Sequence, residues 1–353
     1  MTTLADNKQS KKPAGFVILH EFPTPEIEAL WREFLTRAEF PAHYDTPEFF
    51  LEPYWSGQNP FAILAFDNAK VVGVLTGLHH DAEVVSGLQS RPQLCLDPKA
   101  NAFVTSEILA EGLLHEAGRA KLITVYTWAT TPLPAFPQRG YRFRELEGDV
   151  VLDLKVGAEA LFANFAKNRR RDVRLAIRNG ISVSEAITDE DLRAYWEVYS
   201  AWRKTERKRI HHDRSFAAVE KVHHMRGNHR RFLARYEGKV VAAAGVRFYS
   251  GSVIEYANNC SLDEFMKLLP NDLLFWRTIE WACRHGFKRY SLGGAHPFLR
   301  KWGGTVVPVY RYRLDRTIFR RHDMKENLAD VARKLLRRMP TSWQGKIRKV
   351  LKK

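Results

Sequence analysis

The chain has 353 residues and a net charge of +16 at pH 7, from 56 Lys and Arg against 40 Asp and Glu. Its hydrophobic fraction of 45% is typical of a globular protein, and its length leaves room for two domains. So large a positive charge predicts an anionic partner, such as a nucleic acid, a membrane surface or a phosphorylated substrate.

The cysteines and the polar start of the chain indicate in which cellular compartment the protein resides. Cys95, Cys260 and Cys283 form no closely spaced pair, which argues against a disulfide framework and for a reducing environment. The first residues contain no apolar segment of a signal peptide, and no apolar run approaches the ~18–20 residues of a transmembrane helix. We therefore expect a cytoplasmic protein.

The hydrophobic pattern of the first half predicts an α/β unit that follows a disordered tail at 1–14. Apolar residues at helical spacing predict helices, and short apolar runs bounded by turn residues predict strands. The expected elements are a helix at 26–38, strands at 61–66 and 70–78, a helix at 103–117, and strands at 122–128 and 149–154.

The second half shows the same kinds of pattern with more basic residues. The expected elements are a basic helix at 159–179, a strand at 181–184, a helix at 189–203, strands at 231–235, 240–248 and 252–259, a helix at 271–285, and a strand at 288–292. The small residues from Ala242 to Gly245 predict a close approach by another backbone or a ligand. Two basic amphipathic helices are expected at 323–339 and 342–353.

An internal repeat relates the two halves. The segment FAILAFDNAKVVGVLTG at 61–77 aligns with RFLARYEGKVVAAAGVR at 231–247, and the helix-and-strand segments at 108–128 and 273–294 follow in the same order. This order predicts two tandem α/β (α+β) domains, each a mixed twisted sheet flanked by helices. We place the N-terminal domain at 15–156, the C-terminal domain at 157–320 and a basic helical tail at 321–353.

Four segments of the second half occur in the order found in one known family. They are NRRRDVRLAIRNGISV at 168–183, EYANNC at 255–260, PNDLLFWRTIEWACRHGFKRYSLGGA at 270–295, and FLRKWGG at 298–304. Together they resemble the Fem-type (FemAB-like) peptidoglycan aminoacyltransferases of the GNAT acyltransferase superfamily. The resemblance implies two GNAT-like domains and transfer of an amino acid from aminoacyl-tRNA to an amine of a nucleotide- or lipid-linked envelope precursor, with no bound cofactor.

Two features depart from the family pattern. The family has a long helical-hairpin arm, and the segment 185–230 is too short to form one. The family's loop lysine follows the phenylalanine directly, whereas here Leu299 follows it, and Arg300 and Lys301 come next. The cations that could bind a phosphate in this loop are therefore shifted along the sequence relative to the family pattern.

The strand at 252–259 supplies the candidate catalytic residues. The resemblance places Tyr256 and Asn258 where the strand opens toward an acceptor cleft, although a structural tyrosine in a sheet is the competing interpretation. Glu255 is a candidate general base, by analogy with carboxylates on this strand of acetyltransferases. Alternation along a strand puts Glu255 on one face and both other residues on the opposite face.

Other residues are candidates for holding substrate phosphates. The loop candidates, which a solvated basic turn would also explain, are Arg300, Lys301, Trp302, Gly293, Gly294 and His296. In the basic helix, the resemblance makes Arg170, Arg171 and Arg174 candidates for contacts with tRNA phosphates, against the alternative of a solvated charged face. The histidine pairs at 211–212 and 223–224 lack the spacing of a metal site, and we expect none.

Three functions remain open at this stage. The leading one is aminoacyl transfer to an envelope precursor. An acyl-CoA-dependent N-acyltransferase, with acetyl-CoA or another acyl-CoA as donor, is disfavoured because the loops at 97–107 and 261–272 contain no glycine for a pyrophosphate turn. A non-catalytic RNA- or membrane-binding protein is the third. The C-terminal helices would contact an anionic membrane at its inner face, tRNA or the protein body.

Overall fold

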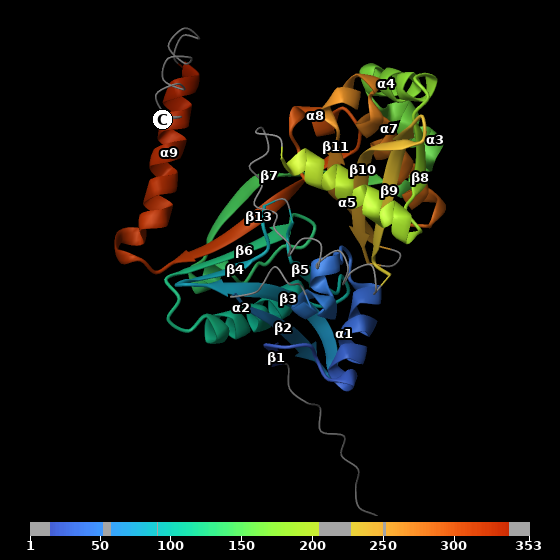
Figure 1. Cartoon of the computed structure of the whole chain (residues 1–353). Helices are drawn as coiled ribbons and strands as arrows, with labels where there is room; N and C mark the ends of the chain where they lie inside the picture. Colours follow the sequence, from blue (N-terminus) through green and yellow to red (C-terminus); the bar gives the residue numbers. More distant parts are fainter. Residues whose placement is uncertain (1–14, 52–57, 90, 205–226, 250–251, 339–353) are drawn as a thin grey trace, which may run out of the picture.

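The structure is a computed structural model that describes residues 15–51, 58–89, 91–204, 227–249 and 252–338. Within these residues, one mixed sheet of 13 strands runs through the whole molecule in the order β1-β2-β3-β4-β6-β13-β7-β12-β11-β10-β9-β8, with β5 beside β3. Figure 1 shows the two halves of the chain side by side along this sheet, with their helices on its faces.

The strands are β1 (Gly15–Leu19), β2 (Asn59–Asp67), β3 (Lys70–His80), β4 (Glu83–Ser86), β5 (Leu94–Leu96), β6 (Leu122–Trp128), β7 (Arg142–Asp153), β8 (Ser182–Glu185), β9 (His229–Tyr236), β10 (Lys239–Phe248), β11 (Val253–Ser261), β12 (Arg289–Ser291) and β13 (Thr305–Asp315). The helices are α1 (Pro25–Arg37), α2 (Ala102–Ala117), α3 (Ala158–Asn164), α4 (Lys167–Arg178), α5 (Asp189–Arg203), α7 (Pro270–Arg284), α8 (Pro297–Arg300) and α9 (Arg321–Arg338). A short 3-10 helix, η1 (His43–Asp45), lies between α1 and β2.

The predicted tandem of two α/β units is confirmed. Each unit contains an antiparallel pair, β2–β3 in the first and β9–β10 in the second. Each also contains a helix that leads into the second strand of a parallel pair, α2 between β4 and β6, and α7 between β11 and β12. The sequence repeat therefore corresponds to a repeat of the architecture.

The two units share strands where they meet. β13 follows the second unit in sequence, yet it lies between β6 and β7, antiparallel to both. β7 in turn pairs with β12 of the second unit. The division at 156/157 stays a prediction, and the topology places a late strand within the sheet of the first unit.

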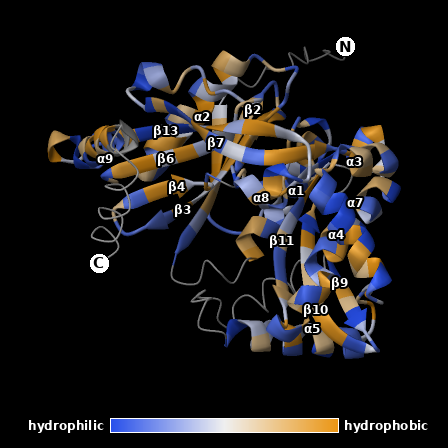
Figure 2. Cartoon of the chain, turned by 90° about the horizontal axis from the view of Figure 1, so that it is seen from above, coloured by the Kyte–Doolittle hydropathy of each residue, from blue (hydrophilic) through white to orange (hydrophobic). Residues whose placement is uncertain are grey.

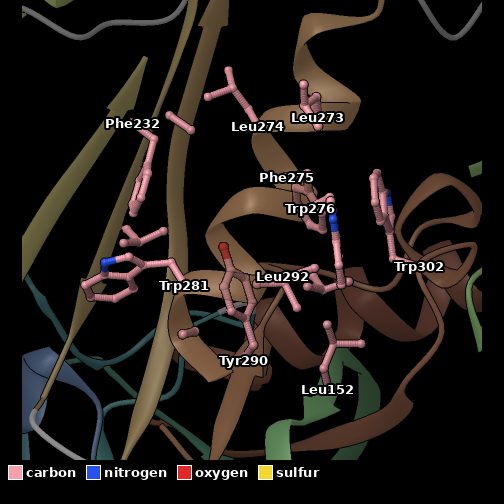
Figure 3. Close-up of a cluster of buried hydrophobic side chains, with 14 of the residues drawn as sticks. Leu152, Phe232, Leu273, Leu274, Phe275, Trp276, Trp281, Tyr290, Leu292 and Trp302 are labelled. Atoms are coloured by element: carbon pink, nitrogen blue, oxygen red, sulfur yellow. The ribbon is translucent and has the colours of Figure 1, made fainter. Parts of the chain in front are cut away.

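The core of the second unit lies between its sheet and α7. Figure 3 shows the side chains of Phe275, Trp276 and Trp281 from α7 close to Tyr290 and Trp302. These residues bury the apolar face of α7, in agreement with the sequence pattern. Packing of this kind fixes the strands that carry the candidate site.

The small residues of β10 allow helices to cover both faces of the sheet. Ala242 and Ala244 face the core with α7, whereas Ala243 packs in a separate cluster with Tyr195 of α5. The predicted close approach at this strand is therefore made by packed helices, one on each face.

The predicted single helix at 159–179 is wrong, because the chain forms α3 and α4 with a break between them. Phe165 has extended backbone angles (φ −64°, ψ 147°), and its ring packs against Trp302 with the ring centroids 5.1 Å apart. The backbone N–H of Ala166 donates a hydrogen bond to the carbonyl oxygen of Lys301 at 2.9 Å. Tertiary contacts with the 296–304 loop thus interrupt a segment whose local pattern is helical.

The predicted helix at 323–339 corresponds to α9, which Figure 1 shows at one side of the molecule, after β13. Within the described part of the chain, no helix is long and apolar enough to cross a bilayer. The predicted tail at 1–14, the helix at 342–353, the basic run at 205–214 and the two histidine pairs lie outside the described residues.

Candidate active site

A β-bulge in β11 determines where the predicted catalytic side chains point. Asn258 pairs with Gly245 of β10, whereas Tyr256 pairs with Val246, so that Ala257 is an extra residue in the ladder. An extra residue shifts the alternation of side chains by one position. Tyr256 and Asn258 therefore lie on opposite faces of the sheet.

This bulge corrects the predicted arrangement of the three residues. Tyr256 packs against Phe275 of α7, with ring centroids 4.5 Å apart. Asn258 lies on the other face, where its Nδ2 donates to the hydroxyl of Tyr195 of α5 at 3.0 Å. Glu255 pairs with Arg247 in the ladder and shares the face of Asn258. The prediction that Glu255 lies opposite Tyr256 is confirmed, but the prediction that Asn258 shares the face of Tyr256 is wrong.

A row of buried polar residues crosses four neighbouring strands on the face of Glu255. The strand registers place in one row His229 of β9, Arg247 of β10, Glu255 of β11 and Ser291 of β12. All four are more than nine-tenths buried. Polar groups so deep in a protein are costly unless they are paired, which makes this row a candidate site. We call it the seam row.

The first unit covers the seam row with η1. The ring Nδ1 of His43 lies 2.9 Å from the Oε2 of Glu255. An Nη of Arg247 donates to the hydroxyl of Tyr44 at 2.9 Å. Although burial raises it, the charges of His43, Arg91 and Arg247 hold the pKa of Glu255 below its ordinary value. Glu255 is therefore ionised at neutral pH, with opposite charges around it.

Asp149 of β7 lies beside the seam row and has different electrostatics. Its Oδ2 accepts a hydrogen bond from the hydroxyl of Ser291 at 3.0 Å, and its Oδ1 is buried with no hydrogen-bond partner among the described residues. Burial raises the pKa of Asp149 to about 7, the negative charge of Glu255 adds to this rise, and the bond from Ser291 opposes it. A carboxyl group with this pKa can accept a proton and return it near neutral pH.

A third buried acid, Asp45 of η1, completes the electrostatic environment. Burial raises the pKa of Asp45 to about 8; the charge of Glu255 adds to the rise, and the hydrogen bond from the Ala42 N–H opposes it. Asp45 is therefore mostly protonated at pH 7. The site combines one ionised acid, one poised near neutrality and one that stays neutral.

A hollow of about 490 Å³ is lined by Gly148, the residue before Asp149 in β7, whereas Asp149 itself is buried and is not among the lining residues. Its lining residues come from both units and include Tyr126, Glu147, Gly148, Gly294 and Ala295. Gly294, one of the predicted substrate-binding residues, thus lines a hollow at the junction of the units. Gly293 and Gly294 both have positive φ (76° and 152°), which favours glycine where the chain turns away from β12.

The 296–304 loop holds the remaining predicted residues in different environments. Trp302 is fully buried against Phe275, with ring centroids 4.4 Å apart, so it anchors the loop and is not placed to contact a phosphate. Arg300 forms an ion pair with Glu147 and donates to the Ala295 carbonyl at 2.6 Å. His296 and Lys301 are exposed. Arg300 therefore ties the loop to the edge of the hollow.

The predicted basic helix, α4, presents a cationic surface. A hollow of about 1050 Å³ lies along it, and its lining residues are Lys167, Asn168, Arg170, Arg171, Arg174, Ile177 and Arg178. Arg171 binds Asp172 at 2.8 Å, and the guanidinium of Arg174 lies over the ring of Phe162. The structure thus brings Arg170, Arg171 and Arg174 together on one surface, which we call the α4 surface.

Arg169 connects the α4 surface with the loop and with α7. It forms ion pairs with Asp172 and with Asp272 in the first turn of α7, and its guanidinium lies 5.2 Å from the centre of the Phe298 ring. Burial raises the pKa of Asp272 to about 6, against the charge of Arg169. The first turn of α7 therefore carries a carboxylate of the protein itself, paired with Arg169.

Sequence reasoning missed the residues that the first unit contributes to the site. His43, Arg91 and Asp149 come from segments that resembled no motif, and only the fold brings them to β11. Arg247 did carry a signal, because it is an arginine inside the otherwise apolar strand VVAAAGVRF. A charged residue in such a run predicts either a strand edge or a buried polar site.

Two tandem α/β units, each with a hairpin, a helix and a parallel strand, and a bulged strand that separates from its neighbour, define a protein of the tandem GNAT fold. In agreement, the sequence model of a family described as "Acetyltransferase (GNAT) domain" matches residues 163–301. The second unit therefore has the GNAT fold and is similar in sequence to acetyltransferases of this type.

Solved structures with the same fold extend the likeness to the first unit. A structure described as "Crystal structure of FemX" superposes with a TM-score of 0.66 at 15% identity, over 85% of this chain and 98% of that one. The C-terminal domain of a putative lysylphosphatidylglycerol synthetase from Agrobacterium fabrum gives a TM-score of 0.60 at 11% identity, over 87% and 96%.

A tandem GNAT protein from the clavulanic acid biosynthesis pathway gives a TM-score of 0.54 at 13% identity, over 86% of this chain and 99% of that one. No curated protein matches the sequence. The chain thus has the fold of the Fem-like branch of tandem GNAT proteins, as its motifs predicted.

Proposed function

We propose that this protein transfers an amino acid from aminoacyl-tRNA to an amine of a cell-envelope precursor. The α4 surface carries this proposal, because its exposed cations adjoin the loop and the helix of the GNAT unit through Arg169. A row of exposed Lys and Arg is suited to the phosphates of a polynucleotide. The likeness to FemX and to lysylphosphatidylglycerol synthetases supports an envelope acceptor.

The N-terminus of α7 argues against coenzyme A as the donor. In an acyl-CoA enzyme of this fold, free backbone N–H groups and the helix dipole at this end would receive the pyrophosphate. Here Asp272 places a carboxylate in the first turn, where it is bound to Arg169. The negative charge of this carboxylate would repel a pyrophosphate, whose binding there would require the ion pair to break.

The seam row and Asp149 provide a route for the transfer chemistry. The acceptor amine attacks the ester carbonyl of aminoacyl-tRNA, an amide bond forms, and the bond to the ribose oxygen breaks. Asp149 takes the proton that the amine loses, because its pKa lies near 7 and its neighbour Gly148 lines the hollow. Asp149 can then return this proton to the leaving ribose oxygen, whereas Tyr256 packs against Phe275 on the opposite face of the sheet and is not placed to take part.

The test uses the purified protein with bulk tRNA charged with labelled amino acids and an extract of envelope precursors. Transfer of label from tRNA to a precursor amine is the expected result, and Asp149→Asn should abolish most of it. Asp67→Asn is the matched control, since Asp67 lies in the exposed β2–β3 turn. Thiol release from acetyl-CoA without label transfer would overturn the proposal in favour of an acyl-CoA enzyme.

A further inference from the structure

α9 docks onto the sheet through its polar side. Arg144 of β7 forms ion pairs with Glu326 at 2.5 Å and Asp330 at 2.7 Å. Arg311 and Arg313 of β13 bind the same Glu326 at 2.5 and 3.1 Å. An amphipathic helix of a globular protein usually packs through its apolar side. α9 is attached the other way round.

The apolar side of α9 consequently faces solvent. Met324, Leu328, Val331 and Leu335 follow one another at helical spacing, and each is at least half exposed. Leu328, in the middle, is 68% exposed. Figure 2 shows orange, hydrophobic bands along α9, which lies at one side of the molecule. We call these four residues the α9 stripe.

The turn before α9 adds to this surface. Ile318 and Phe319 are 75% and 80% exposed. Phe319 and Arg320 have left-handed backbone angles, with φ of 59° and 49°. This conformation is strained for a bulky residue such as phenylalanine, and the side chain of Phe319 is exposed to solvent.

Positive charges lie beside the α9 stripe. Arg321 and Lys325 are exposed, and helical spacing places them next to the stripe, along one of its edges. The sequence after α9 continues with Trp343 and with five cations and no acid, namely Lys346, Arg348, Lys349, Lys352 and Lys353. An apolar stripe bordered by Lys and Arg is suited to the interface of an anionic bilayer.

We propose that α9, with Ile318 and Phe319, docks the protein onto an anionic membrane surface. The polar side of α9 remains bound to β7 and β13 while the stripe enters the headgroup boundary, so the body is held at a fixed orientation. A second copy of the chain is a poorer occupant, because two chains of charge +16 would bring their basic flanks together. This inference does not rest on the proposed transfer reaction.

The experiment measures binding of the full chain to sedimenting vesicles without any transfer substrate. One set contains equal parts of phosphatidylcholine and phosphatidylglycerol, and the other contains phosphatidylcholine alone. The variant is Leu328→Glu in the stripe, and the matched control is Ile187→Glu, a residue before α5 that is also mostly exposed. Both changes add one negative charge at a solvated position, so neither should disturb folding, which circular dichroism checks.

The wild type and Ile187→Glu should bind the anionic vesicles, whereas Leu328→Glu should bind them at least about tenfold more weakly. Neutral vesicles should bind all three proteins weakly. Equal vesicle binding by both variants would overturn the proposal, and so would absence of binding by the wild type. Concentration-dependent dimers that Leu328→Glu abolishes, seen by sedimentation velocity without vesicle binding, would assign the stripe to a second copy instead.

Discussion

The seam row and the α4 surface are both rich in charge, but they hold it in opposite ways. The charges of the seam row are buried under η1 and paired across the two units. Those of the α4 surface are largely solvated, and they are supplied by a single helix. Buried charges shift one another's pKa values, so single residues there should control chemistry. Solvated cations act together through salt-dependent attraction, so each should matter little alone.

Asp149→Asn should give the largest effect on activity. The asparagine keeps the size of the side chain but cannot take the amine proton, so the single-turnover transfer rate should fall about 10²–10⁴-fold. In the wild type, the rate should rise with pH through about 7, as Asp149 loses its proton. A flat pH profile, or a loss of affinity without a loss of rate, would assign Asp149 a structural role.

Glu255→Ala should have the largest effect on stability. It leaves the charges of His43 and Arg247 buried without their carboxylate, which should lower the free energy of unfolding by about 3–5 kcal/mol. Urea denaturation measures this change. The control is Glu33→Ala, which removes an exposed carboxylate paired with Arg37 and should cost about 0.5 kcal/mol or less. Similar losses for the two variants would contradict the pairing in the seam row.

Cations on the α4 surface should contribute moderately and collectively to binding. Replacing Arg170 and Arg178 by glutamine should weaken tRNA binding for all sequences alike, and the slope of log affinity against log salt should fall by about 0.9 for each phosphate that is no longer neutralised. Filter binding over a range of salt concentrations measures the slope. Arg193→Gln, on the exposed side of α5, is the matched control and should leave the slope unchanged.

Asp45→Asn should change how the stability depends on pH. Asp45 keeps its proton in the folded protein up to pH about 8, whereas the unfolded chain loses it near pH 4, so this group makes stability fall as pH rises between these values. The variant should lack this contribution, at most about 1.4 kcal/mol per pH unit. Thermal unfolding of the wild type and the variant from pH 5 to pH 8 measures this contribution. Parallel curves of stability against pH for the two proteins would contradict the raised pKa of Asp45.

Features that depend on local pattern were predictable from the sequence. The two units, the basic residues of α4 and the helix that stops before Gly286 all follow from periodicity and turn residues, and the order of the motifs indicated the fold. The sequence analysis missed β1, β4, β5 and β13: the first three are short strands, and β13 contains Pro308, which weakens a strand signal.

Features that depend on long-range contacts were not predictable. The bulge at Ala257 leaves no trace in the spacing of EYANNC, yet it reverses the face of Asn258. The break at Phe165 arises from packing against Trp302, over a hundred residues later in the chain. His43 and Asp149 join the site only because the first unit packs against β11 and β12, which no local pattern encodes.

The position of β13 has a consequence for synthesis of the chain. The sheet of the first unit is incomplete between β6 and β7 until β13 is inserted, and β13 comes after nearly the whole second unit. When only the first half of the chain has been synthesised, its sheet therefore has unpaired strand edges at β6 and β7. The two units cannot mature one after the other; the nascent protein reaches its native state only when its last strand closes the first sheet.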